Sequence, residues 1–426
     1  MLDRRESNRK DNGMRSLYYI IGIIAILSFY CIVFVNCINI PYWDDYDNFL
    51  QPTILWNSNI TLHEKLAVFF DYNNDHCLLF ARTMAYVSMQ ILGNVNFAFI
   101  IIIGSTLFFA MALVLALSTH KYTHRTYFII LAGILLFNLS YDRAIIWPSV
   151  QFTIYIHVLI SILSLRLLLS KSQWCILAAY LTSFFAISSG GVGIVLVPTG
   201  LFLIIIGENK RKLIIWFGYI ILLFAASWCI RDHEQITLPS LSSLLPFLRY
   251  YIGLCGNIFF NSELICVLIG LILVTAFITI VISRIYKSNI ILTAIIGYLF
   301  LLLLAIAIAR FDTSDQMLAP RYKYFSTILF VSIFLLLAER YHQQMYKYCS
   351  ILLFSAIFCC GITYYNSTFF IIAHKYALVK SICTWEQTGF QYYSNNVERF
   401  TSILNAAVEN GSYVPPDIDC RTLLEQ

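Results

Sequence analysis

The sequence predicts an all-α polytopic integral membrane protein with about eleven transmembrane helices. Of its 426 residues, 59% are hydrophobic and only 12% are charged, and the mean hydropathy is +0.75. Soluble domains carry roughly 25% charged residues, so a soluble or disordered chain is excluded. The net charge of +5 is scattered, which excludes a nucleic-acid-binding stripe. The twelve cysteines include no C-x-x-C pair and no Cys/His cluster, so no metal site is expected.

Eleven apolar stretches account for the predicted spans, because about 20 apolar residues cross a bilayer. They cover residues 17–39, 95–118, 126–141, 150–169, 173–189, 192–207, 213–230, 264–283, 290–309, 324–338 and 349–368. The stretches 126–141 and 324–338 are short for a span. The first stretch is too long for a cleavable signal, and no small-residue cleavage site follows it.

The connections between these stretches sort into a basic set and an acidic set. The basic set holds 16 of the 28 Lys and Arg residues but only 5 of the 23 Asp and Glu residues. It consists of residues 1–16, 120–125, 166–171, 208–212, 284–287 and 339–347. Basic short loops remain in the cytoplasm, so the N-terminus is predicted inside. An odd number of spans then places the C-terminus outside, which is the periplasm if the membrane is a bacterial inner one.

The predicted organisation follows from this alternation. Residues 1–16 form a cytoplasmic N-terminus, residues 17–368 a transmembrane domain, and residues 369–426 a periplasmic tail. Two long outer loops interrupt the domain at 40–94 and 231–263, and the outer connections hold eight of the nine prolines. Because the tail lies on the oxidising side, a disulfide between Cys383 and Cys420 is compatible with its position.

Two helices are expected in the first outer loop. Thr61 and Glu64 have the spacing of a capping box before an apolar stretch that ends at Phe70, which predicts an amphipathic helix on the membrane surface. The apolar segment 77–92 predicts a second helix in the outer leaflet. A true span at 77–92 is the alternative, although it would break the charge alternation.

The same loop opens with three carboxylates in four residues, of which Asp44 and Asp45 come first. Such groups just beyond a span can accept a proton from a sugar hydroxyl or hold a metal ion. The alternative is an acidic outer loop that only obeys topology.

Asp75 and Arg82 would share one helix face if the second helix began at Asp75. An arginine in an apolar helix requires a partner or an anion, because it costs about 2.5–3.5 kcal/mol at mid-bilayer. A phosphate clamp and an internal ion pair with Asp75 or Asp71 are the two interpretations.

Further polar patches lie at the outer ends of later spans. Arg143, Trp147 and Gln151 form one, with an interfacial turn as the alternative, and the Ser-Gly break at 188–193 is either an anion site or a tight turn. Three cations, Arg310, Arg321 and Lys323, oppose the topology rule. An outer anionic ligand explains them, and pairing with Asp312 and Asp315 is the rival explanation.

The order of these features resembles the bacterial GT-C type membrane glycosyltransferases, and within them the serotype-converting O-antigen glucosyltransferases. The resemblance extends to about residue 330 and depends on Trp43-Asp44-Asp45, Asn74-Asp75-His76 with Arg82, Trp147 to Gln151, the break at 188–193 and Pro320-Arg321-Tyr322. Two motifs depart from the family: His76 is followed by Cys77 where the family has arginine, and Pro320 replaces a serine.

The resemblance implies transfer of a sugar, with glucose expected, from an undecaprenyl-phosphate donor to O-antigen on the periplasmic face. Asp44 or Asp45 would be the general base. The donor phosphate would be held by a set of cationic side chains: His76, Arg82 and Arg321, with Arg143 and Arg310 as second choices. The substrate contacts implied are Asp75, Trp147, Gln151 and Tyr322. No cofactor is expected, although a divalent cation at Asp44 and Asp45 stays an alternative.

The implied partners are the lipid-linked donor, the glycan acceptor and the bilayer, with dependence on a flippase and a cytoplasmic donor synthase. No nucleic acid is expected. An O-antigen polymerase or ligase and a non-enzymatic lipid-linked sugar transporter are the rivals. The acidic pair after the first span favours the transferase, and the absence of an internal sequence repeat weighs against the transporter.

Overall fold

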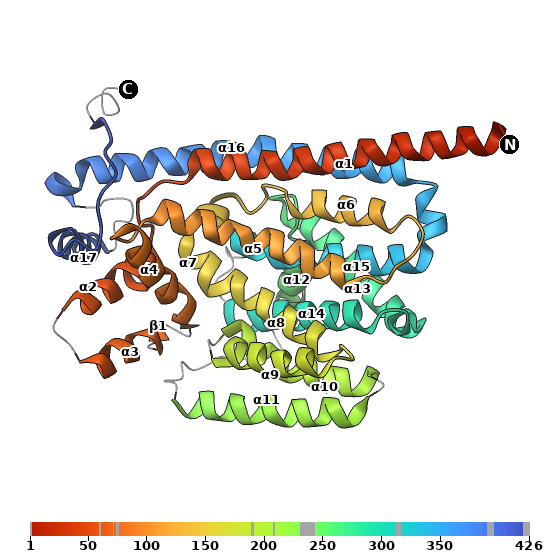
Figure 1. Ribbon diagram of the computed structural model, residues 1–426, viewed down its shortest axis with the longest axis horizontal. Helices are drawn as coiled ribbons and strands as arrows, with labels where there is room; N and C mark the ends of the chain where they lie inside the picture. The colour runs from red at the N-terminus through yellow and green to blue at the C-terminus, as the bar shows by residue number, and fades with distance from the viewer. Residues whose placement is uncertain are drawn as a thin grey trace.

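The computed structural model is a bundle of helices that run roughly parallel to one axis (Figure 1). It describes residues 2–58, 61–70, 72–73, 76–188, 191–207, 209–230, 243–311, 317–389 and 396–420. Within these residues, seven helical segments are long and apolar enough to cross a membrane. Six of them are or lie within α1 (Leu2–Asn36), α5 (Phe97–Ser118), α13 (Glu263–Ile282), α14 (Ile290–Arg310), α15 (Pro320–Tyr346) and α16 (Cys349–Thr388).

The seventh segment is continuous over Pro148–Leu168 but consists of α7 (Pro148–Val150), a π-helical turn η3 (Gln151–Tyr155) and α8 (Ile156–Leu168). The remaining helices of the bundle are α6 (Arg125–Leu136), α9 (Gln173–Ser188), α10 (Leu196–Ile206) after the 3₁₀ turn η4 (Gly191–Val195), α11 (Lys210–Ile230) and α12 (Leu244–Cys255). The 3₁₀ turns η2 (Asp142–Ile146) and η6 (Ile285–Lys287) lie in connections. The structure therefore confirms a helical membrane protein, while about eleven full spans remains a prediction.

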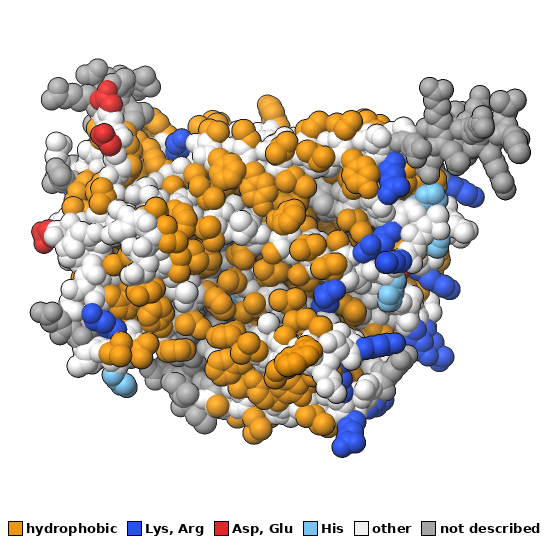
Figure 2. Space-filling model, viewed as in Figure 1, with side chains coloured by type: hydrophobic (Ala, Val, Ile, Leu, Met, Phe, Trp, Pro, Cys, Tyr) orange, Lys and Arg blue, Asp and Glu red, His pale blue; other side chains and the backbone are white. Residues whose placement is uncertain are grey.

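Large apolar side chains cover the outside of the bundle, an arrangement that is unfavourable in water. Large side chains such as Leu222, Ile272 and Phe354 are 71%, 67% and 71% exposed on α11, α13 and α16. Figure 2 shows such side chains as a broad apolar zone across the molecule. Exposed apolar area of this kind marks a membrane-facing surface, and α14 and α15 form the enclosed centre behind it.

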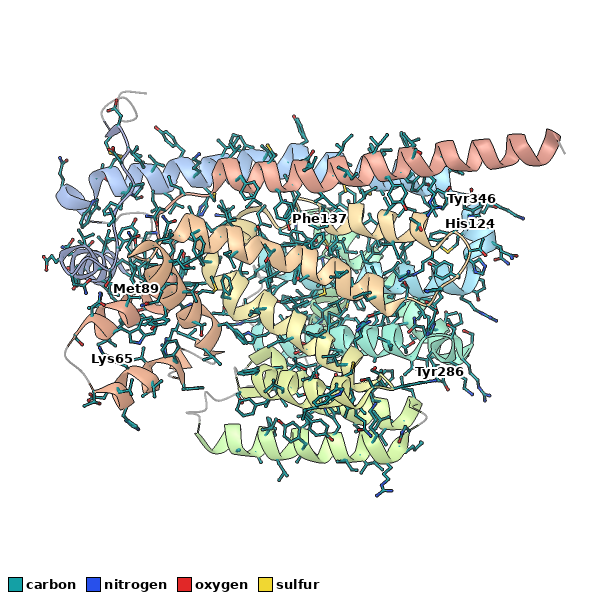
Figure 3. All side chains as sticks on the ribbon, viewed as in Figure 1. Lys65, Met89, His124, Phe137, Tyr286 and Tyr346 are labelled. Carbon is teal, nitrogen blue, oxygen red and sulfur yellow. A yellow bond between two sulfur atoms is a disulfide. The ribbon has the colours of Figure 1, made fainter. Side chains whose placement is uncertain are left out.

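The two ends of the bundle differ in charge and in the connections of the chain that form them. On the face in Figure 2, Lys and Arg side chains gather at the end where α1 begins. Figure 3 places His124, Tyr286 and Tyr346 at that end and Lys65 and Met89 at the other. Connections that the sequence assigns to one side of the membrane are therefore close in space.

Direct contacts join three segments of the chain at the basic end. The His124 ring stacks on Tyr346 with centroids 3.5 Å apart. His120 Nδ1 lies 2.6 Å from Glu339 Oε1, and Asn289 Nδ2 donates to Glu339 Oε2 at 3.0 Å. These contacts link the ends of α5, α14 and α15.

The first outer loop forms a helical cap at the opposite end, drawn at the left of Figure 1. It contains η1 (Tyr46–Leu50), α2 (Gln51–Asn57), α3 (Leu62–Phe70), a hairpin of β1 (Tyr72–Asn73) with β2 (His76–Cys77), and α4 (Leu79–Leu92). The predicted capping box is confirmed, because the Thr61 N–H donates to Glu64 Oε2 at 2.7 Å and the Glu64 N–H donates to Thr61 Oγ1 at 3.3 Å.

Two expectations for this loop need correction. His76 and Cys77 pair with the preceding strand, so the helix begins at Leu79 and not at Asp75 or Cys77. Backbone hydrogen bonds of the hairpin take the place of helical ones there. With 14 residues, α4 is about 21 Å long and too short for a span.

Several predicted boundaries also shift. Residues 2–16 are helical and continue directly into the first span as α1, and α16 runs through 368 without a break to Thr388. The short stretch 126–141 is a helix only to Leu136. The loop 231–263 contains α12, which the sequence analysis did not predict as a helix; its segment 231–242, like Asp71, Asp312 and Asp315, lies outside the described residues.

The C-terminal segment is docked on the cap. The helix α17 (Val397–Glu409) buries Phe400, Leu404 and Ala407, a spacing that forms one helical face. Tyr413 Oη donates to the Asn39 carbonyl at 2.6 Å, and the Val95 N–H donates to the Ser412 carbonyl at 2.8 Å. The C-terminal segment is therefore part of the folded end of the bundle that carries the cap.

A disulfide between Cys383 and Cys420 closes this segment, with a sequence separation of 37 residues. Cross-linking a loop of that length lowers the conformational entropy of the unfolded chain, which stabilises the folded state by about 4 kcal/mol. We expect Cys420→Ser to increase hydrogen exchange of the α17 amides, measured by mass spectrometry on the oxidised protein. The control is Cys31→Ala, because Cys31 is a free, exposed cysteine of α1. Unchanged exchange in Cys420→Ser would show that packing alone holds the segment.

Candidate active site

The candidate site lies where the cap meets the ends of the spans, and its first part is the acidic loop. Trp43 has φ 48°, a conformation that is uncommon for a bulky residue. The turn at Trp43 brings the Asp45 carboxylate back to the Tyr42 N–H, which donates to Asp45 Oδ2 at 2.9 Å. Such strain is often found at functional sites.

Asp45 is completely buried and is bound at the start of a spanning helix. Its Oδ1 accepts hydrogen bonds from the Ser149 N–H at 3.0 Å and from Ser149 Oγ at 2.5 Å. The N–H groups in the first turn of a helix have no intrahelical partner and favour a negative charge. Burial raises the pKa of Asp45 to about 7, and the hydrogen bonds from Ser149 and Tyr42 oppose that increase. Asp45 therefore fixes the loop to α7.

Asp44 is the more accessible of the two carboxylates and has a cationic neighbour. Its side chain is partly exposed. Burial raises the pKa of Asp44 to about 6, the Asp47 carboxylate adds to the increase, and the Arg321 guanidinium opposes it. Arg321 lies in the first turn of α15, far from Asp44 in the sequence, and its guanidinium lies 5.0 Å from the Tyr322 ring centroid.

Aromatic rings flank these groups. The rings of Tyr42 and Trp147 are 4.9 Å apart, and those of Trp43 and Trp147 are 6.5 Å apart. Tyr42 also meets His374 of α16 at 4.4 Å. Aromatic faces next to carboxylates are suited to holding a sugar ring, because its C–H face is apolar and its hydroxyls are polar.

A second charged group lies beside the aromatic rings. Arg143 Nε is 3.5 Å from Asp142 Oδ1, and Arg143 interacts electrostatically with His374. Asp142 has φ 45° and interacts with Lys323, which is 2% exposed and donates a hydrogen bond to Asn261 Oδ1. Arg143 is thus paired with Asp142 in this structure.

The other predicted site residues occupy different surroundings. The Arg82 guanidinium is buried and donates to the Val68 carbonyl of α3, which ties α4 to α3. Gln151 is fully buried, and its Nε2 donates to the Ile145 carbonyl at 2.7 Å. Arg310 interacts with Tyr250 of α12, as Arg321 does. Asp75 and the side chain of His76 lie outside the described residues.

The structure thus joins Asp44, Asp45, Trp147 and Arg321, and it adds groups that the sequence analysis did not select. Ser149 holds Asp45, Tyr42 and His374 extend the aromatic wall, and the tail contributes Arg399. Ser149 carried a sequence signal, because it follows Trp147-Pro148. For Arg399 there was none, since nothing in the tail sequence indicates which outer loop it contacts.

A metal site has no support in the part of the chain that the structure describes. No group of three or more His, Cys, Asp or Glu side chains there is arranged to hold a metal ion. The oxygens of Asp45 are occupied by Tyr42 and Ser149, so Asp44 and Asp45 do not form a joint ligand pair in this arrangement.

The cap, α7, α15 and α16 together supply a partly exposed carboxylate, a fixed cation and an aromatic wall at one end of a membrane bundle. Such a group of residues can remove a proton from a hydroxyl and stabilise a negative charge nearby. Comparisons of this chain with protein-family models, with curated proteins and with solved structures give no match.

Proposed function

We propose that this chain is a membrane glycosyltransferase. It moves a sugar from a polyprenyl-phosphate donor to a glycan hydroxyl, at the outer face of the membrane in which the chain is embedded. The observation that carries the proposal is that partly exposed Asp44, next to the aromatic rings of Tyr42, Trp43 and Trp147, interacts electrostatically with Arg321 in the first turn of α15. A lipid-linked donor suits a site at this position, because its phosphate lies at the bilayer surface.

In this proposal, Asp44 takes the proton of the acceptor hydroxyl, and the acceptor oxygen attacks the anomeric carbon. The bond from that carbon to the phosphate oxygen breaks, and the phosphate leaves with the bonding electrons. Arg321 stabilises the charge that develops there. One displacement of this kind inverts the anomeric centre. Because Asp45 is buried and positions the loop, the proposal gives the base role to Asp44 rather than to Asp45.

The resemblance to the serotype-converting O-antigen glucosyltransferases supports glucose as the sugar and O-antigen as the acceptor. It also supports a bacterial inner membrane with the N-terminus in the cytoplasm and the C-terminus in the periplasm. The accumulation of Lys and Arg at one end of the bundle agrees with that orientation (Figure 2).

The test is the glycan of lipopolysaccharide from cells with and without the gene, in a host that makes the lipid-linked sugar and its flippase. Mass spectrometry and linkage NMR should find one added hexose per repeat unit. A changed chain length with an unchanged repeat would instead support an O-antigen polymerase. Accumulation of lipid-linked sugar at the outer face, without any transfer, would support a transporter.

The pH dependence of transfer follows from the state of Asp44. A base must be ionised, and burial raises the pKa of Asp44 to about 6. We therefore expect transfer to be low at acidic pH, to rise through about pH 6 and to level off above it. The measurement is the initial rate of transfer in membranes against pH at saturating donor. A rate that falls over this range would exclude an ionised carboxylate as the base.

A further inference from the structure

The C-terminal helix α17 delivers a cation to the acidic loop. Arg399 Nη2 lies 2.6 Å from Asp47 Oδ1, and the side chains of the two residues are 57% and 14% exposed. An arginine and a carboxylate at this distance form a charge-assisted hydrogen bond. The pair joins the end of the chain to a residue three positions from Asp44.

Contacts on both sides of Arg399 fix its place. The neighbouring Phe400 ring stacks on Tyr46, the residue before Asp47, with centroids 4.6 Å apart. The hydrogen bonds of Ser412 and Tyr413 and the Cys383–Cys420 disulfide hold the rest of the segment on the cap. Arg399 is therefore held against Asp47 by the fold and not by its own ion pair alone.

Two carboxylates of the acidic loop, one of them the proposed base, lie between two cations. This row of charges consists of Arg399 on α17, Asp47 and Asp44 on the loop, and Arg321 on α15, with Asp45 next to Asp44. Burial raises the pKa of Asp47, and Arg399 opposes that increase. Asp47 in turn raises the pKa of Asp44. Without Arg399 the row loses one positive charge, which makes a proton on Asp44 or Asp47 more favourable.

We propose that Arg399 is a positioning residue of the active site: by pairing with Asp47, it balances the charge of the acidic loop so that Asp44 can act as the base. The inference rests on the proposed glycosyl transfer and deepens it. It makes the C-terminal segment a part of the site, although α17 does not carry the reacting groups.

The test replaces Arg399 by Gln in the full chain and follows two readouts against pH. The first is the rate of transfer, whose rise should move to higher pH by about half to one unit, so that the loss is large near pH 6 and small near pH 8. The second is labelling of Asp44 by a carbodiimide and an amine, located by mass spectrometry. Carbodiimides react with the protonated carboxyl, so the midpoint of labelling should move in the same direction.

Three variants separate this coupling from a general loss of structure. Arg399→Lys keeps the charge and should restore most of the wild-type profile. Asp47→Asn removes the negative charge that Arg399 balances, so it should move both midpoints the other way, to lower pH. Arg249→Gln is the matched control. Arg249 Nε lies 2.7 Å from Glu263 Oε1 in an exposed ion pair of the loop 231–263.

Unchanged midpoints in Arg399→Gln would overturn the inference, as would a shift to higher pH in Asp47→Asn. A uniform loss of rate at every pH, with an unchanged labelling midpoint, would show that Arg399 only stabilises the fold. If the chain shows no glycosyl transfer at all, the proposed function fails while labelling still decides whether Arg399 controls Asp44.

Discussion

Asp44→Asn is expected to reduce glycosyl transfer by roughly 10²- to 10⁴-fold, the usual contribution of a positioned general base. The amide has nearly the same shape as the carboxylate, but it cannot accept the proton of the acceptor hydroxyl. Asp44 is partly exposed, and no hydrogen bond of its carboxylate is among the contacts described. We therefore expect normal protein levels in the membrane and a rate that no longer rises through pH 6.

Two comparisons sharpen this prediction. Asp417→Asn removes an exposed carboxylate from the tail and should leave the rate unchanged. Asp45→Asn should lower the amount of folded protein as well as the rate, because Asp45 is completely buried and accepts hydrogen bonds from Tyr42 and Ser149. Wild-type transfer by Asp44→Asn, at equal protein level, would refute its role as the base.

The sequence predicted the outline of the fold well because membrane insertion leaves a strong pattern. Apolar stretches and the basic connections placed nearly every spanning helix, and the Thr61–Glu64 spacing correctly predicted α3. The pattern is weaker where a segment is short or irregular. The hairpin at Tyr72–Cys77 and the helix α12 were missed. The strands have only two residues each, and α12, with 12 residues, is shorter than a span although Phe247, Tyr250 and Leu254 recur at helical spacing.

The site was predictable only in part, for a related reason. A polar residue at the outer end of a span is visible in the sequence, and Asp44, Asp45, Trp147 and Arg321 were found in this way. Which of them meet depends on packing between distant elements. The pairing of Asp45 with Ser149 and that of Asp47 with Arg399 span 104 and 352 positions, and no local pattern encodes them.

Packing also separated residues that looked alike in the sequence. Arg82 and Arg321 are both cations near an outer interface, but the first donates to the Val68 carbonyl while the second interacts with Asp44. The same distinction applies to Trp147 and Gln151, which are one helical turn apart. Trp147 contacts the aromatic rings of the site, whereas Gln151 is buried against Ile145.

Arg321→Gln is expected to reduce transfer by roughly 10²- to 10³-fold, similar to the loss of one donor that stabilises a developing negative charge. The loss should fall mainly on the maximal rate and less on the donor concentration at half rate, because the phosphate gains charge as it leaves. Arg321 also opposes the increase in the pKa of Asp44. Its removal should therefore move the rise of the rate to higher pH, in addition to lowering its plateau.

Arg321→Lys separates these two effects. A lysine keeps the positive charge but lacks the planar fork that binds a phosphate through two hydrogen bonds. We expect it to restore the wild-type pH dependence while most of the loss in maximal rate persists. The measurement is the full pH profile of all three proteins with a polyprenyl-phosphate sugar. If Arg321→Gln lost only donor affinity, at an unchanged maximal rate and pH profile, Arg321 would bind the donor without stabilising its departing phosphate.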